Sequence, residues 1–182
     1  MSHSNAIVAP LVSDNLGLLQ ELNMTEGVLD LACGNGRNGL FLLQHHIPVT
    51  FADNNESALG EVEQKLEACT TKAQIWQVDL EVPGQDPLAG KQFDAILVFN
   101  YLHRPLMNSI QNAVRPGGLV MYETFTVDQA KHGRPSNPDF LLKPGELLDS
   151  FAAWEILSYN EGERSNPVSA KASLVARKAE AQ

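Results

Sequence analysis

Short apolar runs alternate with amphipathic stretches along most of this chain, and this pattern predicts strands that alternate with helices. The expected strands are residues 27–31, 47–52, 73–78, 93–99, 119–125, 154–159 and 172–177. The expected helices are residues 14–23, 36–44, 56–68, a segment with Leu106, Ile110 and Val114 on its inner face, and 144–151.

This order of elements predicts an α/β fold, a doubly wound and mostly parallel seven-stranded sheet covered by helices on both faces. The last two strands have no room for a helix between them, so we expect an antiparallel final pair. A length of 182 residues suits one domain, with residues 1–12 as an N-terminal arm. Residues 127–142 are rich in Gly, Pro and Asn and long for a connection, which makes them a candidate lid loop.

Composition narrows the possible partners. The formal charge is −9 and the 13 basic residues form no run, which disfavours long nucleic acids. No apolar run approaches the roughly 20 residues that span a bilayer, and residues 1–5 show no secretory signal. The two cysteines and five histidines have no metal-ligand spacing, so no metal site is expected. A cytoplasmic protein follows as the expectation.

The most informative segment joins the first strand to the first crossover helix. Its sequence, Gly34-Asn35-Gly36-Arg37-Asn38-Gly39, lies where backbone N–H groups and a helix N-terminus approach a ligand. Asp53 ends the next strand, 19 positions after Gly34, close to the spacing at which a carboxylate reaches a ribose. The chain is therefore predicted to bind a cofactor that contains a nucleoside.

Asp30 indicates which cofactor this is. It stands at the end of the first strand, where it would repel a pyrophosphate and attract an ammonium group. S-adenosylmethionine carries both an ammonium and a ribose, which fit Asp30 and Asp53. Gly34 and Gly36 are expected to resist larger side chains because the ligand lies against their backbone.

Five motifs, in order and nearly end to end, resemble those of class I S-adenosylmethionine-dependent methyltransferases. They are residues 28–36, the strand ends at Asp53 and Asp79, residues 93–100 and Arg115-Pro116-Gly117-Gly118. Residues 33–38, 144–147 and 159–161 are similar to the tellurite-resistance-type members. The resemblance implies a Rossmann-like methyltransferase fold, with S-adenosylmethionine as the cofactor. The chain departs from the pattern at Ala32, where glycine is common, and at residues 100–105.

The resemblance further implies that Asp79 and Leu80 flank the adenine. Phe99, Asn100 and Tyr101 stand at the end of the fourth strand. Ligands of such sheets bind at the carboxyl ends of the strands, so all three are expected beside the methionine portion. The expected cofactor-binding residues are Asp30, Ala32, Gly34, Gly36, Arg37, Asp53, Asn54, Asp79, Leu80, Phe99 and Asn100.

The candidate residues for positioning the acceptor are His103, Arg104, Tyr122 and Arg134. His103 and Arg104 are either a base and an anion-binding group, or a helix cap and a surface residue. In the candidate lid loop Arg134 stands near Lys131 and His132, and together they could close over an anionic acceptor. Displacement at a sulfonium needs in-line positioning rather than a nucleophile–base pair. The predicted acceptor is a small molecule that is anionic or a soft nucleophile.

Two other functions stay open. A nicotinamide-dependent reductase would use the same glycines, but it leaves Asp30 unexplained and the chain has no Tyr-Lys pair at helical spacing. A non-catalytic module that binds S-adenosylmethionine is the other alternative. The acceptor's identity and the oligomeric state are left open by the sequence.

Overall fold

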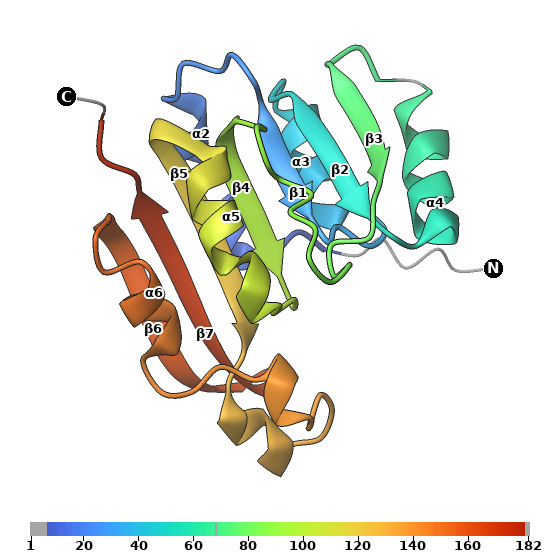
Figure 1. Cartoon of the computed structure of the whole chain (residues 1–182). Helices are drawn as coiled ribbons and strands as arrows, with labels where there is room; N and C mark the ends of the chain where they lie inside the picture. The colour runs from blue at the N-terminus through green and yellow to red at the C-terminus, as the bar shows by residue number, and fades with distance from the viewer. Residues whose placement is uncertain (1–6, 68, 181–182) are drawn as a thin grey trace.

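The alternating strands and helices fold into one twisted sheet with helices on both of its faces (Figure 1). The computed structural model describes residues 7–67 and 69–180. The strands are β1 (Val28–Leu31), β2 (Val49–Asp53), β3 (Ala73–Gln77), β4 (Phe93–Phe99), β5 (Val114–Phe125), β6 (Glu155–Ser165) and β7 (Val168–Arg177). The helices are α1 (Pro10–Ser13), α2 (Leu16–Gln20), α3 (Arg37–Gln44), α4 (Glu56–Leu66), α5 (Met107–Ala113) and α6 (Glu146–Ser150). Short 3₁₀ turns are η1 (Arg104–Leu106), η2 (Val127–Lys131) and η3 (Pro138–Phe140).

The strand order is β3-β2-β1-β4-β5-β7-β6. Neighbours from β3 to β5 are parallel, whereas β7 runs antiparallel to both β5 and β6. This arrangement confirms the predicted fold class, including the antiparallel final pair.

The core lies in two layers because successive side chains of a strand point to opposite faces. In β4, Ile96 and Val98 pack on the face covered by α5 and α6. Ala95 and Leu97 pack on the opposite face with residues of α2, α3 and α4. Burial of β4 on both faces explains its continuous apolar sequence.

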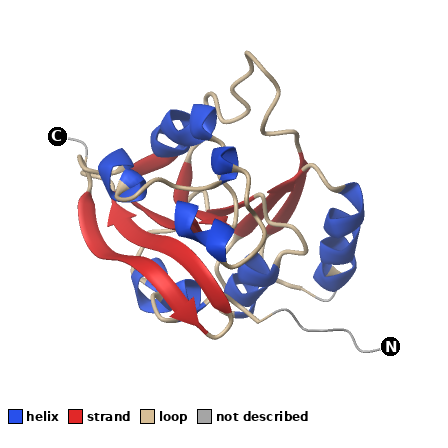
Figure 2. Cartoon of the chain, turned by 90° about the horizontal axis from the view of Figure 1, so that it is seen from below, coloured by secondary structure: helices blue, strands red, loops and turns tan. Residues whose placement is uncertain are grey.

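The parallel strands all end at one edge of the sheet, the edge that faces the viewer in Figure 2. The chain leaves β1 toward β2 on one side, and returns to β4 on the other. In open α/β sheets, ligands bind at this reversal of strand order. The fold therefore places the β1–α3 turn and the residues after β2, β3 and β4 along one edge.

Three boundaries expected from the sequence were wrong. The leading helix begins at Pro10 and breaks at Asn15, whose side-chain amide bonds to the Leu11 carbonyl at 2.9 Å. Val114 opens β5 instead of ending a helix, and a register shift between Phe93 and Ala95 accommodates this early start. The β6–β7 hairpin is longer than predicted because residues 161–165 continue to pair with residues 168–172.

The structure describes part of the N-terminal arm that was expected at residues 1–12. Residues 1–6 of the expected arm lie outside the described residues, whereas Ala9 and Val12 are buried in the core. Residue 68, the expected end of the second crossover helix, also lies outside them. In residues 7–67 and 69–180, no helix is long and apolar enough to cross a membrane.

Candidate active site

A tight turn joins β1 to α3 and is tied to the end of β2. The Cys33 amide donates to the Ala52 carbonyl at 3.0 Å, and the Gly36 amide donates to the Cys33 carbonyl at 2.9 Å. The backbone is left-handed at Ala32, Gly34 and Gly36, with φ of 52°, 55° and 72°. A side chain in this region costs about 1–2 kcal/mol relative to glycine. Ala32 is therefore strained, which gives a physical reason for the glycine common in the resembling family.

The glycines of this turn have different roles. A Cβ added at Gly34 would have no neighbour within 4 Å, so the turn is open on that side. A Cβ at Gly36 would lie 2.8 Å from a Val62 methyl, and one at Gly39 would lie 2.3 Å from the Phe51 ring. Gly36 and Gly39 let α3 pack closely against its neighbours. Close packing is thus one reason why position 36 is small, and the expected contact of Gly36 with a ligand stays a prediction.

The Asp53 carboxylate lies beside the open side of the turn. Its Oδ2 accepts a hydrogen bond from the Gly34 amide at 2.7 Å, and its Oδ1 accepts one from the Asn55 amide at 2.9 Å. These bonds orient the half-buried side chain at the carboxyl edge of the sheet. The placement fits a carboxylate that reaches a ribose, which stays a prediction, and Asn54 lies exposed next to it.

Asp30 is buried under the same turn, with 3% of its surface exposed. Its Oδ2 accepts a hydrogen bond from the Gly39 amide at 2.9 Å. Burial raises the pKa of this carboxyl from 3.8 to about 7, although the Gly39 bond and the Arg37 charge oppose the rise. A cationic ligand group nearby would favour the ionised form.

The other expected cofactor residues follow β3 and β4 at the same edge. Asp79 is exposed and its Oδ1 accepts a hydrogen bond from the Glu81 amide at 2.9 Å. Leu80 and Phe99 are buried in the core on either side of the sheet. Asn100 is left-handed, with φ of 55°, and ends β4 at the surface.

Tyr101, which was also expected beside the methionine portion, has an unusual hydroxyl. Among the residues that the structure describes, this oxygen is buried without a hydrogen bond of good geometry, although the Glu81 carboxylate lies close to it. Burial raises the pKa of Tyr101, and the nearby carboxylates of Glu81 and Asp79 raise it further. The hydroxyl therefore stays protonated, and it lies near the residues expected to flank the adenine. A polar ligand group would satisfy it.

Arg104 ties residues 127–142 to α6. Its Nε donates to Glu146 Oε1 at 2.6 Å and its Nη2 to Oε2 at 2.9 Å. The guanidinium also donates to the carbonyls of Asp139 at 2.9 Å and Leu141 at 2.8 Å. These bonds hold the segment in place and argue against direct positioning of an acceptor by Arg104.

Tyr122 is buried, with 1% of its surface exposed. Its hydroxyl donates to the Tyr101 carbonyl at 3.0 Å, so it supports the backbone after β4. This arrangement fits a supporting role for Tyr122, and its expected part in positioning the acceptor stays a prediction. His103 is half-buried before η1 and Arg134 is exposed, and their roles stay predictions.

The loop cations beside Arg134 have acidic partners. Lys131 Nζ lies 2.6 Å from Asp128 Oδ1, and His132 Nε2 lies 3.1 Å from Glu163 Oε1. Two of the three basic side chains that were expected to close over an anion therefore already face a carboxylate on the surface.

A second charged cluster lies near the end of β5 and the start of β7, and its central residue, Lys171, was not among the expected site residues. The Lys171 ammonium donates to Asn100 Oδ1 at 2.6 Å and to Glu123 Oε1 at 3.3 Å. Arg164 Nη1 lies 2.9 Å from Glu123 Oε2. The sequence signal was a lysine between two buried alanines, Ala170 and Ala172, on a strand that is otherwise mostly apolar.

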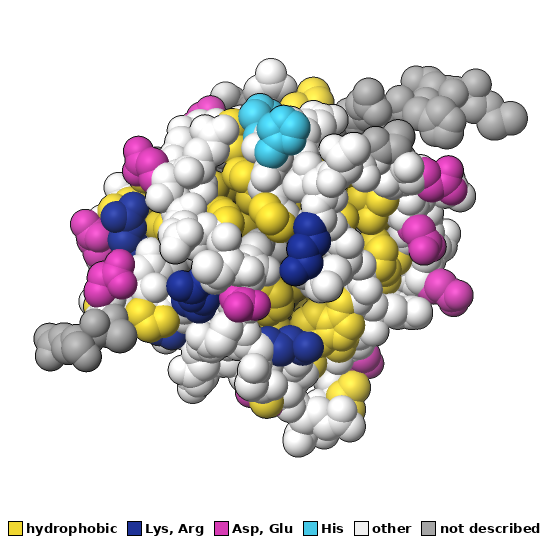
Figure 3. Space-filling model, turned by 90° about the horizontal axis from the view of Figure 1, so that it is seen from above, with side chains coloured by type: hydrophobic (Ala, Val, Ile, Leu, Met, Phe, Trp, Pro, Cys, Tyr) yellow, Lys and Arg dark blue, Asp and Glu magenta, His cyan; other side chains and the backbone are white. Residues whose placement is uncertain are grey.

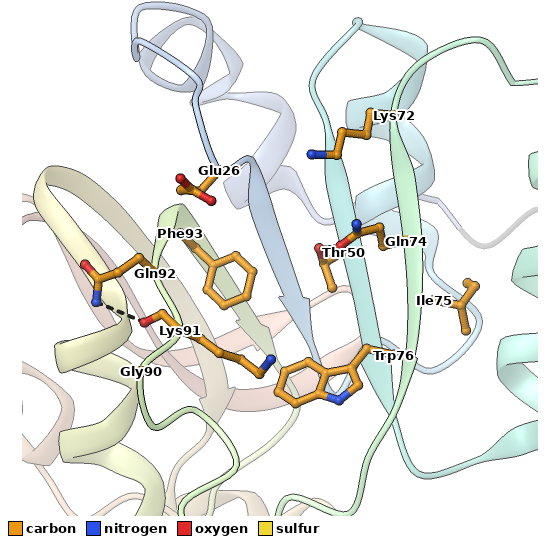
Figure 4. A pocket seen from close by; sticks show the side chains of 10 residues that line it. All are labelled: Glu26, Thr50, Lys72, Gln74, Ile75, Trp76, Gly90, Lys91, Gln92 and Phe93. Atoms are coloured by element: carbon orange, nitrogen blue, oxygen red, sulfur yellow. Dashed lines mark hydrogen bonds between the residues drawn. The ribbon is translucent and has the colours of Figure 1, made fainter.

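A groove of about 670 Å³ runs along β2 and β3, from Glu26 and Phe93 at the amino-terminal edge of the sheet to Trp76 near the end of β3 (Figure 4). It includes Trp76, and the Lys91 ammonium lies 4.4 Å from the centre of that ring. Viewed toward this edge, basic side chains lie around patches of apolar surface (Figure 3). The groove is thus separate from the glycine turn.

The family model described as tellurite resistance protein TehB matches residues 11–166. A probable S-adenosyl-L-methionine-dependent methyltransferase TehB from Haemophilus influenzae is 28% identical over 168 residues, 83% of this chain and 57% of that protein. Hemagglutinin 1 from Eikenella corrodens is 29% identical over 144 residues, 73% of this chain and 45% of that protein. The chain thus spans about half the length of these relatives.

Solved structures agree with the fold. TehB from Haemophilus influenzae superimposes with a TM-score of 0.71 at 23% identity, covering 91% of this chain and 62% of that one. Magnesium protoporphyrin IX methyltransferase from Synechocystis PCC 6803, with bound SAH, gives 0.67 at 16% identity, covering 93% and 81%. These likenesses confirm the Rossmann-like methyltransferase fold that the motifs predicted.

Proposed function

Because the chain belongs to the tellurite resistance protein TehB family, we propose that it transfers a methyl group from S-adenosylmethionine to a small acceptor. The acceptor is a small anion or a soft nucleophile. The observation that carries the proposal is the placement of Asp30, Gly34 and Asp53 around one open turn.

The residues at this edge fit the cofactor. The open side of Gly34 leaves room for a ligand against the backbone, and Asp53 lies directly beside it. Asp30 offers a buried carboxylate for an ammonium, and the buried Tyr101 hydroxyl lies near Asp79 and Glu81. These groups match the ribose, the ammonium and the polar atoms of S-adenosylmethionine.

When bound, the cofactor supplies an electrophilic methyl group on a sulfonium. The chain's contribution is to hold this methyl in line with the acceptor and to keep water out. Asn100 follows β4 beside the cofactor edge, and residues 127–142 follow β5. We therefore assign the acceptor to the space between these two segments.

The alternatives make different use of the same turn. A nicotinamide cofactor would bring a pyrophosphate against the buried Asp30 carboxyl, which disfavours a reductase. A non-catalytic module would bind S-adenosylmethionine without turnover.

The cytoplasmic location also stays a prediction.

Calorimetry and a labelled-methyl assay test the proposal. We expect micromolar binding of S-adenosylmethionine, no binding of NADH, and transfer of label to an acceptor in a panel of small thiols and anions that includes tellurite. Binding of NADH in place of S-adenosylmethionine would overturn it. Tight cofactor binding without transfer to any acceptor would favour the non-catalytic module.

A further inference from the structure

The charged cluster around Lys171 lies on the acceptor side of the cofactor edge. In the sheet register Lys171 lies opposite Phe125, the last residue of β5. Its ammonium bonds to Asn100, the residue that follows β4. Asp53, expected at the ribose, ends β2 on the other side of β1. Lys171 is thus placed toward the methyl rather than the nucleoside.

The electrostatics connect this cluster to the glycine turn. Burial lowers the pKa of Lys171, while Glu123 opposes that effect and the positive charges of Arg164 and Arg37 add to it. Arg37 is the first residue of α3, directly after the turn. Because the charge of Arg37 affects the pKa of Lys171, the Lys171 ammonium lies within electrostatic range of the cofactor-binding residues.

The cluster carries an excess of positive charge. Lys171 and Arg164 share the single carboxylate of Glu123, which leaves one positive charge unmatched among these three groups. Lys171 has three N–H groups, and the described residues accept from it at Asn100 and Glu123. One N–H is left for a ligand. Only 12% of its side chain is exposed, so a charge met there is poorly screened.

We propose that Lys171 binds the negative charge of the methyl acceptor, which is a small anion. This inference rests on the proposed function. It places the anion beside the end of β5 and the start of β7. The other candidate position lies under the basic residues of the segment 127–142, but Lys131 and His132 of that segment already have acidic partners.

The chemistry of methyl transfer agrees with an anion at this position. A lone pair of the anion forms the new bond to the methyl carbon while the carbon–sulfur bond breaks. The bonding pair stays on sulfur, so a sulfonium and an anion become two uncharged centres. No proton has to be removed. Because the anion loses its charge in this step, Lys171 is expected to act mainly on acceptor binding.

A purely structural role is the competing explanation. Lys171 also lies 4.5 Å from the centre of the Phe125 ring, and a lysine could simply pin β7 to β5. A buried ion pair is a costly way to do this, since apolar residues of similar volume often stabilise as well or better.

The test is titration of tellurite into protein saturated with S-adenosylhomocysteine, followed by calorimetry. We expect Lys171→Met to weaken tellurite binding at least tenfold and Lys171→Arg to stay within about threefold of the wild type. Affinity for S-adenosylhomocysteine should not change in either variant. The matched control is Lys65→Met, an exposed lysine on α4, which should leave both affinities unchanged.

Glu123→Gln is a second variant, needed if Lys171→Met does not fold. Removing this carboxylate leaves the cations less compensated, so tellurite should bind more tightly. A folded Lys171→Met protein with unchanged tellurite affinity would overturn the inference, as would a wild-type complex that binds no tellurite. Failure of the proposed function looks different, because the wild type would then not bind S-adenosylhomocysteine at all.

Discussion

Gly34 and Gly36 offer a direct comparison at the scale of single residues, since both are left-handed but only Gly34 has open space beyond it. Gly34→Ala places a methyl where the cofactor is expected, and we predict at least a tenfold loss of S-adenosylmethionine affinity. Gly36→Ala forces Val62 or Phe51 to move and should lower stability by about 1–3 kcal/mol more. Calorimetry and thermal unfolding of both variants test this. Normal cofactor binding by Gly34→Ala would contradict it.

The contribution of Asp53 to cofactor affinity can be measured with a single substitution. A charge-assisted hydrogen bond is worth about 1.5–3 kcal/mol, and about 1.4 kcal/mol is a factor of ten. Asp53→Ala should therefore weaken S-adenosylmethionine binding roughly tenfold to a hundredfold. Glu63→Ala, an exposed carboxylate on α4, is the control and should bind normally. Equal affinity in the two variants would remove Asp53 from the site.

The sequence predicted these residues because they belong to one continuous local pattern. A strand, a glycine turn and a carboxylate on the next strand have fixed spacing, so Asp30, Gly34 and Asp53 could be placed without the fold. Lys171 could not, because its partners Asn100 and Glu123 lie on other segments, far away in sequence. Only the folded sheet brings them together.

At the scale of elements, the segment of residues 127–142 is held at both ends. The Val127 amide donates to the Leu142 carbonyl at 2.9 Å, and Gln129 Oε1 accepts from the Ala170 amide at 2.8 Å. Arg104 adds the bonds to Asp139 and Leu141 described above. A segment anchored in this way opens only when several bonds break together.

Removing the Arg104 anchor should therefore loosen the segment. After allowance for solvent screening, the lost bonds are worth about 1–2 kcal/mol. We expect Arg104→Ala to be cleaved by a protease within residues 127–142 about tenfold faster than the wild type. Arg134→Ala is the matched control, because its side chain is exposed and its cleavage rate should not change. Equal rates in the two variants would show that Arg104 does not anchor the segment.

The elements differ in how far the sequence predicts them. β4 was placed within its observed bounds because burial on both faces leaves a continuous apolar run. Residues 160–165 and 168–171 were missed as strand because they form a mostly polar two-stranded extension, in which many side chains face solvent. Val114 was assigned to a helix because its spacing from Ile110 suits either conformation. Val114 is a strand residue because it pairs with Phe93 of β4. Phe93 lies far from Val114 in the sequence, so local spacing does not reveal this pairing.

At the scale of the whole molecule, the two edges of the sheet have separate roles. The turn, Asp53 and the Lys171 cluster lie at the carboxyl edge, whereas the groove begins at the amino edge, runs along β2 and β3 and is lined by none of these residues. Helices cover both faces of the sheet between the two edges. We therefore expect cofactor binding to change the stability of the protein mainly through groups at the carboxyl edge.

Asp30 is the group at that edge that couples binding to the stability of the entire fold. Its pKa is about 7 in the folded chain and 3.8 ordinarily, because burial disfavours the charge. The folded state thus keeps a proton that the unfolded state has lost. Stability falls as the pH rises from 3.8 to 7, by about 4 kcal/mol for this group. Asp30→Asn should remove this cost, with a larger gain in unfolding free energy at pH 8 than at pH 5.

The same carboxyl should make cofactor binding depend on pH in the opposite sense. An ammonium beside Asp30 favours the ionised form, so below pH 7 binding must release the proton. Wild-type affinity for S-adenosylmethionine should then fall by up to about tenfold per pH unit below 7, and calorimetry at pH 6 in two buffers should detect a released proton. The neighbouring Arg37 and Asp53 are unchanged in Asp30→Asn, which should bind with little pH dependence and release no proton. A wild-type affinity that is constant between pH 5 and 8 would show that Asp30 does not meet the ammonium, and its burial would then serve only the packing of α3 against β1.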